Sequence, residues 1–266
     1  MAEDAQRTAQ WTPWSAVASP GTPKLVAVVN WFQRRRTRID APKLRPRAAA
    51  DTPSTKVDLA TLTPDVATFL GKAAYLELAI FENLSRVVRT APSTEAKSTL
   101  SQVAGFALVK HQGLTAELER HGEVPAEAMQ PFVAEIDRFQ RMTEGNDWFE
   151  SLTSCYLTAG FLDDFLVRLA AGLPGAAGAR IVSILEADSG EAIVVAELLS
   201  ATSENPRLGA RLAMWGRRMV GDTMLLARWM LRPSEDHASD EAQIEPVFTE
   251  LIAAHTRRMD ALGLTA

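Results

Sequence analysis

The chain has 266 residues, of which 47% are hydrophobic, and carries a formal net charge of -5. This length allows one substantial core, and we expect one domain with a terminal extension. Cys155 is the single cysteine, which excludes an internal disulfide framework and a thiolate metal cluster and fits the reducing cytoplasm. The longest apolar runs fall far short of the roughly 20 residues of a membrane span, and the first residues lack the apolar stretch of a cleaved secretory signal. We therefore expect a cytoplasmic protein without a transmembrane segment.

Residues 1–60 are predicted to form a basic, largely irregular extension ahead of a helical domain over residues 61–266. Eight basic residues against a single acid lie within residues 24–47, so the rest of the chain is strongly acidic. Clustered arginines beside Trp31 and Phe32 are suited to phosphate contacts and base stacking on RNA. The candidate nucleic-acid contacts are Arg34, Arg35, Arg36, Arg38, Lys43, Arg45 and Arg47. A solvated tail or a membrane-surface anchor would fit the same composition.

From residue 63 onward, long segments free of breakers alternate with short Pro- and Gly-containing breaks, which predicts a series of helices. The predicted helices cover residues 64–90, 93–122, 126–143, 146–172, 177–202, 205–232 and 240–264. No segment has the alternating pattern of a strand. Two short links and one longer connection among the four long central helices predict an all-α four-helix bundle with one crossover connection and additional C-terminal helices.

Several acids fall on the apolar faces of these helices when each is placed on a helical wheel. In the first helix Glu77 shares the apolar stripe, whereas Glu82 lies on the other side and is expected at the surface. In helix 177–202 both Asp188 and Glu191 lie on the apolar stripe. These acids are therefore predicted to point into the bundle.

The other two central helices add further polar residues to the predicted interior. Helix 146–172 is apolar nearly all round, so at least one of Asp163 and Asp164 must be enclosed, and the wheel favours Asp164. Helix 93–122 places His111 on its apolar stripe and Lys110 at the edge of that stripe.

Ionised acids in an apolar interior are costly unless a cation or protons balance them. Glu, Asp and His are ligands of non-haem iron and manganese, so a metal is one solution. The ammonium group of a lysine is another. The candidate centre, which is either a metal site or a charge-paired core site, consists of Glu77, Lys110, His111, Asp164, Asp188 and Glu191.

Four stretches of residues 63–266 carry a resemblance to known proteins: AAYLELAIFENL, AMQPFVAEIDRFQRMTEGNDWFESL, ARLAMWGRRMVGD and AAHTRRMDALGL. They resemble the ferritin-like superfamily, and more closely the bacterial proteins similar to tRNA 2-methylthio-isopentenyladenosine hydroxylase. The resemblance implies a di-iron centre that activates oxygen, in which two helices each give one carboxylate and the other two each give Glu-x-x-His. Glu77 and Asp164 fit the single-carboxylate positions. The resemblance also makes tRNA a candidate partner of the basic segment.

The chain departs from this ligand pattern in two helices. It offers Ala107-x-x-Lys110 and Asp188-x-x-Glu191 where Glu-x-x-His is required, so both ligand histidines are missing. The preferred interpretation is a ferritin-like protein with an altered or lost metal centre and a binding or pseudoenzyme role. The alternatives are an active oxygen-dependent hydroxylase or oxidase that uses iron and acts on modified tRNA, or acids that pair separately without a shared site. The sequence assigns no catalytic residue and leaves a homodimer open.

Overall fold

The structure is a computed structural model that describes residues 59–232 and 237–264. Within these ranges the chain forms helices and no strand, which confirms the predicted all-α fold. None of the described helices is sufficiently long and apolar to cross a bilayer. The candidate nucleic-acid residues between Arg34 and Arg47 lie outside the described residues.

The helices follow the predicted order closely. They are α1 (Val66–Thr90), α2 (Thr94–Arg120), α3 (Pro125–Met129), a short 3-10 turn (Gln130–Phe132), α4 (Val133–Met142), α5 (Trp148–Ala170), α6 (Gly175–Leu185), α7 (Glu191–Glu204), α8 (Pro206–Met230) and α9 (His237–Ala261).

Four of the long helices begin at side chains that cap their first backbone N–H groups. Asp65, Ser93, Asp147 and Asn205 each accept a hydrogen bond from the N–H group three residues later. Such a cap satisfies a donor that the helix itself leaves unpaired and stabilises the helix by about 1 kcal/mol. The capping residues therefore explain why these helices start where they do.

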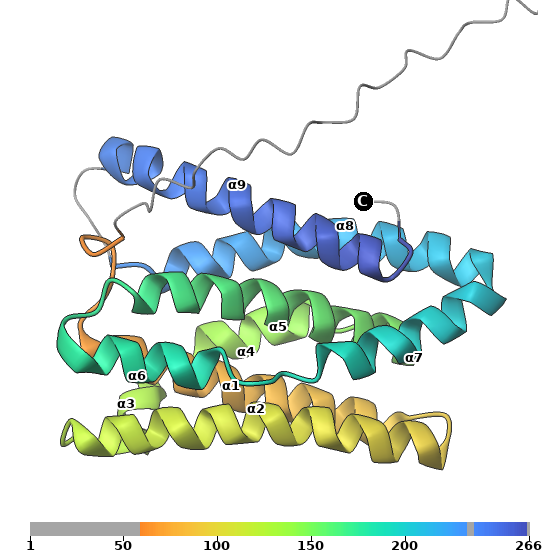
Figure 1. Cartoon of the computed structure of the whole chain (residues 1–266), viewed down its shortest axis with the longest axis horizontal. Helices are drawn as coiled ribbons and strands as arrows, with labels where there is room; N and C mark the ends of the chain where they lie inside the picture. Colours follow the sequence, from red (N-terminus) through yellow and green to blue (C-terminus); the bar gives the residue numbers. More distant parts are fainter. Residues whose placement is uncertain (1–58, 233–236, 265–266) are drawn as a thin grey trace, which may run out of the picture. The chain divides into compact units, whose positions relative to one another are not determined.

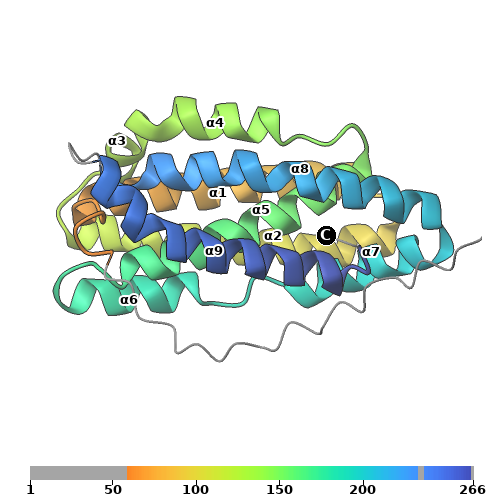
Figure 2. The ribbon, with the colours of Figure 1, turned by 90° about the horizontal axis from the view of Figure 1, so that it is seen from above.

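The helices α1, α2, α5 and the pair α6–α7 form the bundle (Figure 1). Helix α1 packs along α2 and also against α5, while α6 and α7 each pack against both α2 and α5. The segment α3–α4 provides the crossover, because it returns along α1 from the end of α2 to the start of α5 (Figure 1). Helices α8 and α9 both pack on α5, and α4 lies beside α8 (Figure 2). Helix α5 is thus the central element.

The fourth helix of the bundle differs from its prediction, because it is broken in two. Gly190 has φ of 71°, a left-handed conformation that cannot continue an α-helix. Its N–H donates to Oδ1 of Asp188 at 2.8 Å, which fixes the turn between α6 and α7. A helical wheel that treats residues 177–202 as one continuous helix therefore misplaces the residues at this break. The break moves Asp188 off the predicted inner stripe and leaves it exposed.

The close packing of the crossover on α1 gives a test of the fold. A Cβ atom at Gly71 would lie 2.3 Å from the backbone oxygen of Ala128 in α3, whereas a Cβ at Gly105 in α2 would meet nothing within 4 Å. We predict that Gly71→Ala lowers the free energy of unfolding by about 1–3 kcal/mol. The control Gly105→Ala should raise it by about 0.5–1 kcal/mol, because alanine loses less backbone entropy in a helix. Urea unfolding followed by circular dichroism measures both, and equal effects would contradict this packing.

Candidate charge-paired centre

Three ionisable side chains from three helices meet inside the bundle. Glu77 lies in the middle of α1 and is 1% exposed, and Lys110 of α2 is 3% exposed. The Nζ atom of Lys110 lies 2.5 Å from Oδ2 of Asp163 in α5, whose side chain is 16% exposed. A charged hydrogen bond this short in a dry environment is among the stronger side-chain interactions. The three residues are named the charge-paired centre below.

The protonation of Glu77 follows from its surroundings. Burial raises the pKa of Glu77 well above its usual value, the charge of Asp163 raises it further, and Lys110 opposes both effects. Oε1 of Glu77 and Oδ1 of Asp163 are both buried without a hydrogen-bond partner among the described residues. A proton on Glu77 removes both deficits, since the carboxylic acid can donate to the carboxylate of Asp163. Glu77 is therefore assigned as neutral.

Lys110 keeps its proton in the same environment. Burial lowers the pKa of Lys110, but the charge of Asp163 and the hydrogen bond to it act against burial, and the pKa lies above its ordinary value. With Lys110 positive, Asp163 negative and Glu77 neutral, the centre carries no net charge. This balance explains how three ionisable groups are accommodated in an apolar interior.

A second cluster lies between α5, α7 and α9. Arg258 of α9 donates to Oδ2 of Asp164 at 2.9 Å and to Oε1 of Glu191 at 3.1 Å. Burial disfavours the charge of Arg258, but the two acids outweigh burial and raise its pKa. Its side chain is 14% exposed, whereas those of Asp164 and Glu191 are 35% and 43% exposed. Arg258 thus holds α9 against the bundle through acids near the surface.

A cavity of about 40 Å³ lies beside the charge-paired centre, and Glu77, Lys110, Asp163 and Glu191 all line it. The rest of its lining is mainly apolar. Such a volume is enough for a few water molecules at most. The α6–α7 break reaches the edge of the cavity at Ser189.

The structure brings only part of the predicted candidate set together. Glu77 and Lys110 meet at the centre, and Glu191 reaches the adjacent cavity. The remaining predicted positions lie elsewhere: Asp164 pairs with Arg258, Asp188 is exposed in the α6–α7 turn, and His111 uses its Nδ1 to contact a backbone oxygen of α1 at 2.8 Å.

Two of these placements correct the sequence-based assignment. Asp163, rather than Asp164, is the α5 acid that faces Lys110, because consecutive residues point about 100° apart and α5 is enclosed on most sides. The wheel could not choose between two neighbouring directions that are both covered by other helices. Arg258 was not selected at all, because nothing in its own helix indicates that it reaches Asp164.

Comparison with known proteins identifies the family. A family model described as a ferritin-like domain of actinomycetes matches residues 61–239. The chain belongs to this ferritin-like domain family. A search of curated proteins finds no match. The matched region of the ferritin-like chain contains all of the bundle helices and the whole charge-paired centre.

The side chains of this ferritin-like bundle do not fit the di-iron group that the fold implies. Such a centre takes four carboxylates and two histidines from four helices. Here Lys110 is buried on the inner side of α2 and pairs with Oδ2 of Asp163, and a protonated lysine offers no lone pair to a metal. Within residues 59–232 and 237–264, no three His, Cys, Asp or Glu side chains are grouped so that they could hold a metal ion.

The protonation pattern of the centre predicts unequal effects of neutralising its two acids. Glu77→Gln keeps a neutral side chain of the same shape and should change the free energy of unfolding by less than about 1 kcal/mol. Asp163→Asn removes the partner of Lys110 and should cost about 1–3 kcal/mol, since Glu77 can then ionise in its place. The double variant leaves Lys110 without any carboxylate and should cost about 3–5 kcal/mol. Equal costs for the two single variants in urea unfolding would contradict a neutral Glu77.

The raised pKa of Glu77 also predicts a pH dependence of stability. A folded-state pKa above the unfolded value of 4.5 means that the folded chain binds more protons between the two values. The stabilisation is complete below pH 4.5 and is lost as the pH rises toward the folded pKa, at up to about 1.4 kcal/mol per pH unit. Other carboxylates titrate in both proteins, so urea unfolding of the wild type and Glu77→Gln over this range should show a steeper loss of stability with pH in the wild type. Parallel curves of unfolding free energy against pH for the two proteins would contradict the assignment of a neutral Glu77.

Proposed function

We propose that this ferritin-like protein balances its core acids with Lys110 instead of a metal, and that it acts as a binding protein and not as a di-iron oxygenase. The observation that carries the proposal is the 2.5 Å contact between Lys110 Nζ and Asp163 Oδ2 inside the bundle. The contact places a permanent positive charge among the acids that a metal would require.

The chemistry of the lysine supports this proposal. A protonated amine has no lone pair for a metal, and the raised pKa of Lys110 keeps it protonated. A divalent ion at Asp163 would bring two further positive charges next to Lys110 in a medium that screens charge poorly. Metal binding would therefore require Lys110 to leave the core or to lose its proton. Neither change is favoured while Asp163 is its partner.

The alternative function, an oxygen-dependent hydroxylase or oxidase acting on modified tRNA, stays a prediction from the sequence. It rests on the resemblance to tRNA 2-methylthio-isopentenyladenosine hydroxylase and on the basic residues from Arg34 to Arg47. No contact among the described residues favours it, and the homodimer also stays a prediction.

Metal analysis of the purified chain tests the proposal directly. After aerobic expression with added iron, we expect fewer than about one iron per chain, against the two of a complete di-iron centre. About two iron ions per chain would overturn the binding-protein proposal. The same measurement with manganese added separates a change of metal from a loss of metal.

A lysine variant provides a second test with its own control. Lys110→Met leaves Asp163 without its cation in the bundle interior, so the free energy of unfolding should fall by about 3–5 kcal/mol. Lys97→Met, at an exposed position of α2, should change it by less than about 0.5 kcal/mol. Equal effects of the two variants in urea unfolding would contradict the proposal.

A further inference from the structure

A larger pocket lies on the other side of α1 from the α2 contact surface, between α1, the α4–α5 connection and α5. Its volume is about 270 Å³, several times that of the cavity at the charge-paired centre. The two hollows share Ile80 and Cys155 in their linings, so these side chains lie between them. This pocket, named the α1–α5 pocket below, has room for a small organic molecule.

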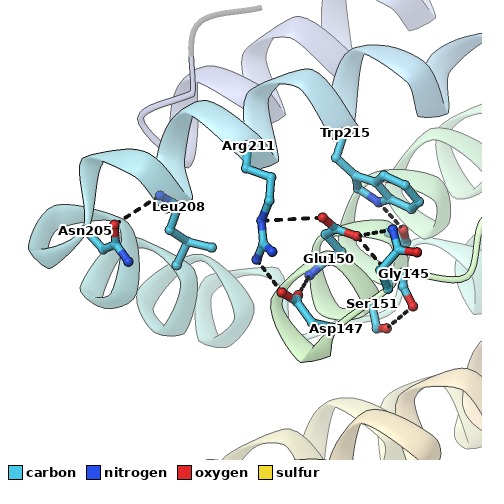
Figure 3. A network of polar contacts seen from close by, with 10 residues as sticks. Gly145, Asp147, Glu150, Ser151, Asn205, Leu208, Arg211 and Trp215 are labelled. Carbon is cyan, nitrogen blue, oxygen red and sulfur yellow. Dashed lines mark hydrogen bonds and ion pairs between the residues drawn. The ribbon is translucent and has the colours of Figure 1, made fainter.

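A network of polar contacts holds the α4–α5 wall of this pocket in place (Figure 3). Glu150 is 5% exposed and accepts hydrogen bonds from the backbone N–H and the side-chain amide of Asn146, at 2.9 and 2.8 Å. Arg211 reaches across from α8 to Glu150 at 3.4 Å and to Asp147 at closer range. Figure 3 shows Arg211 with one contact to each of the two acids. The connection is therefore braced by a third helix, which is the rigidity that a preformed binding site needs.

The positive charge of the pocket comes from α1. Arg86 and Arg89 both line it, and neither forms an ion pair within the part of the chain that the structure describes. Of the two acids that line the pocket, Asp147 is already paired with Arg211, and Glu144 is exposed at the rim. The arginines therefore outnumber the free acid at the pocket.

Arg86 and Arg89 lie three residues apart on α1, so their side chains stand beside each other on one face of the helix, and both are exposed. A guanidinium with planar, forked donors is suited to a carboxylate or a phosphate group.

The remaining walls are suited to an organic body. Ile80 and Val87 provide buried apolar surface, and Trp148 is fixed beside them because its indole N–H donates to the backbone oxygen of Val87 at 3.0 Å. Hydroxyl and amide side chains, including Ser151, Thr158 and Asn83, form the polar part of the lining. An inorganic ion would leave this apolar surface uncovered.

We propose that the α1–α5 pocket binds a small organic anion, with its acid group between Arg86 and Arg89 and its apolar body against Ile80, Val87 and Trp148. This inference rests on the binding role proposed above and names the class of ligand. The site is separate from the charge-paired centre, so the two proposals fail under different measurements.

Three small probes of matched size or charge test the ligand class by isothermal titration calorimetry. Benzoate has both the acid group and the flat body, benzamide has nearly the same shape without the charge, and inorganic phosphate has charge without the body. We expect benzoate to bind at least about tenfold more tightly than either of the others, a difference of about 1.4 kcal/mol. Benzamide or phosphate binding as tightly as benzoate would overturn the proposal, as would no benzoate binding at millimolar concentration.

Variants of the full chain locate the site. Arg86→Gln and Arg89→Gln should each weaken benzoate binding at least about fivefold, and Ser151→Leu should weaken it by filling the pocket. The control Arg217→Gln removes an exposed arginine of α8 that lies outside the pocket lining and should leave the affinity unchanged. Equal affinities for the wild type and the two pocket arginine variants, at unchanged melting temperatures, would overturn the assignment of the site.

Metal analysis of the same samples separates the two proposals. A chain with about two iron ions that still binds benzoate through Arg86 overturns the metal-free function and upholds the pocket. A chain without iron that does not bind benzoate upholds the lysine centre and overturns the pocket.

Discussion

The contact between Lys110 and Asp163 is the constraint on which the interior of this protein depends. Burying either charge alone would cost several kcal/mol, a large share of the stability of an ordinary domain. The pair therefore links α2 to α5, two helices that both pack against α1, and a shift of either helix would separate the two atoms. Glu77 can join them from α1 only as a neutral acid. The proton on Glu77 and the positive charge of Lys110 together leave the three ionisable groups without net charge, so an apolar core can hold them.

The adjacent acids of α5 show how one helix serves two separate cations. Asp163 points inward to Lys110 and Asp164 points toward Arg258, so the two carboxylates are neutralised by different helices. The first contact binds the bundle helices together, and the second attaches α9 to them through a side chain near the surface. The central position of α5 follows, since it contacts the bundle on one side and α8 and α9 on the other. The packing of the helices and the pairing of the two acids therefore both place α5 at the centre of the fold.

The sequence predicted the helices well because their signals are local. Capping residues such as Asp65 and Ser93, and prolines such as Pro92, set the helix ends through contacts within a few residues. The centre was harder to predict, since its geometry depends on side chains from distant helices. Glu77 was selected because it falls on an apolar stripe, and Lys110 because it lies at the edge of one, where a charged residue is conspicuous.

The errors in the candidate site have equally physical causes. An isolated glycine is tolerated within a helical pattern, so the Ser189-Gly190 turn signal was given less weight than the apolar periodicity on either side, and the left-handed turn that leaves Asp188 exposed was missed. Asp163 and Asp164 differ by one step of a helix that is covered on most sides, and their partners decide which faces the centre. Arg258 lies almost one hundred positions from Asp164 in the chain, and its long side chain reaches an acid that its own helix does not indicate.

The protonation state of Glu77 tests this account most directly, because a charge-neutral centre requires the acid to keep its proton. Carbon-13 NMR of the side-chain carboxyl groups at neutral pH, with Glu77→Gln used to assign the signal, measures that state. The account predicts a protonated carboxyl signal for Glu77 that does not titrate near the usual value of 4.5. An ionised Glu77 at neutral pH would contradict it.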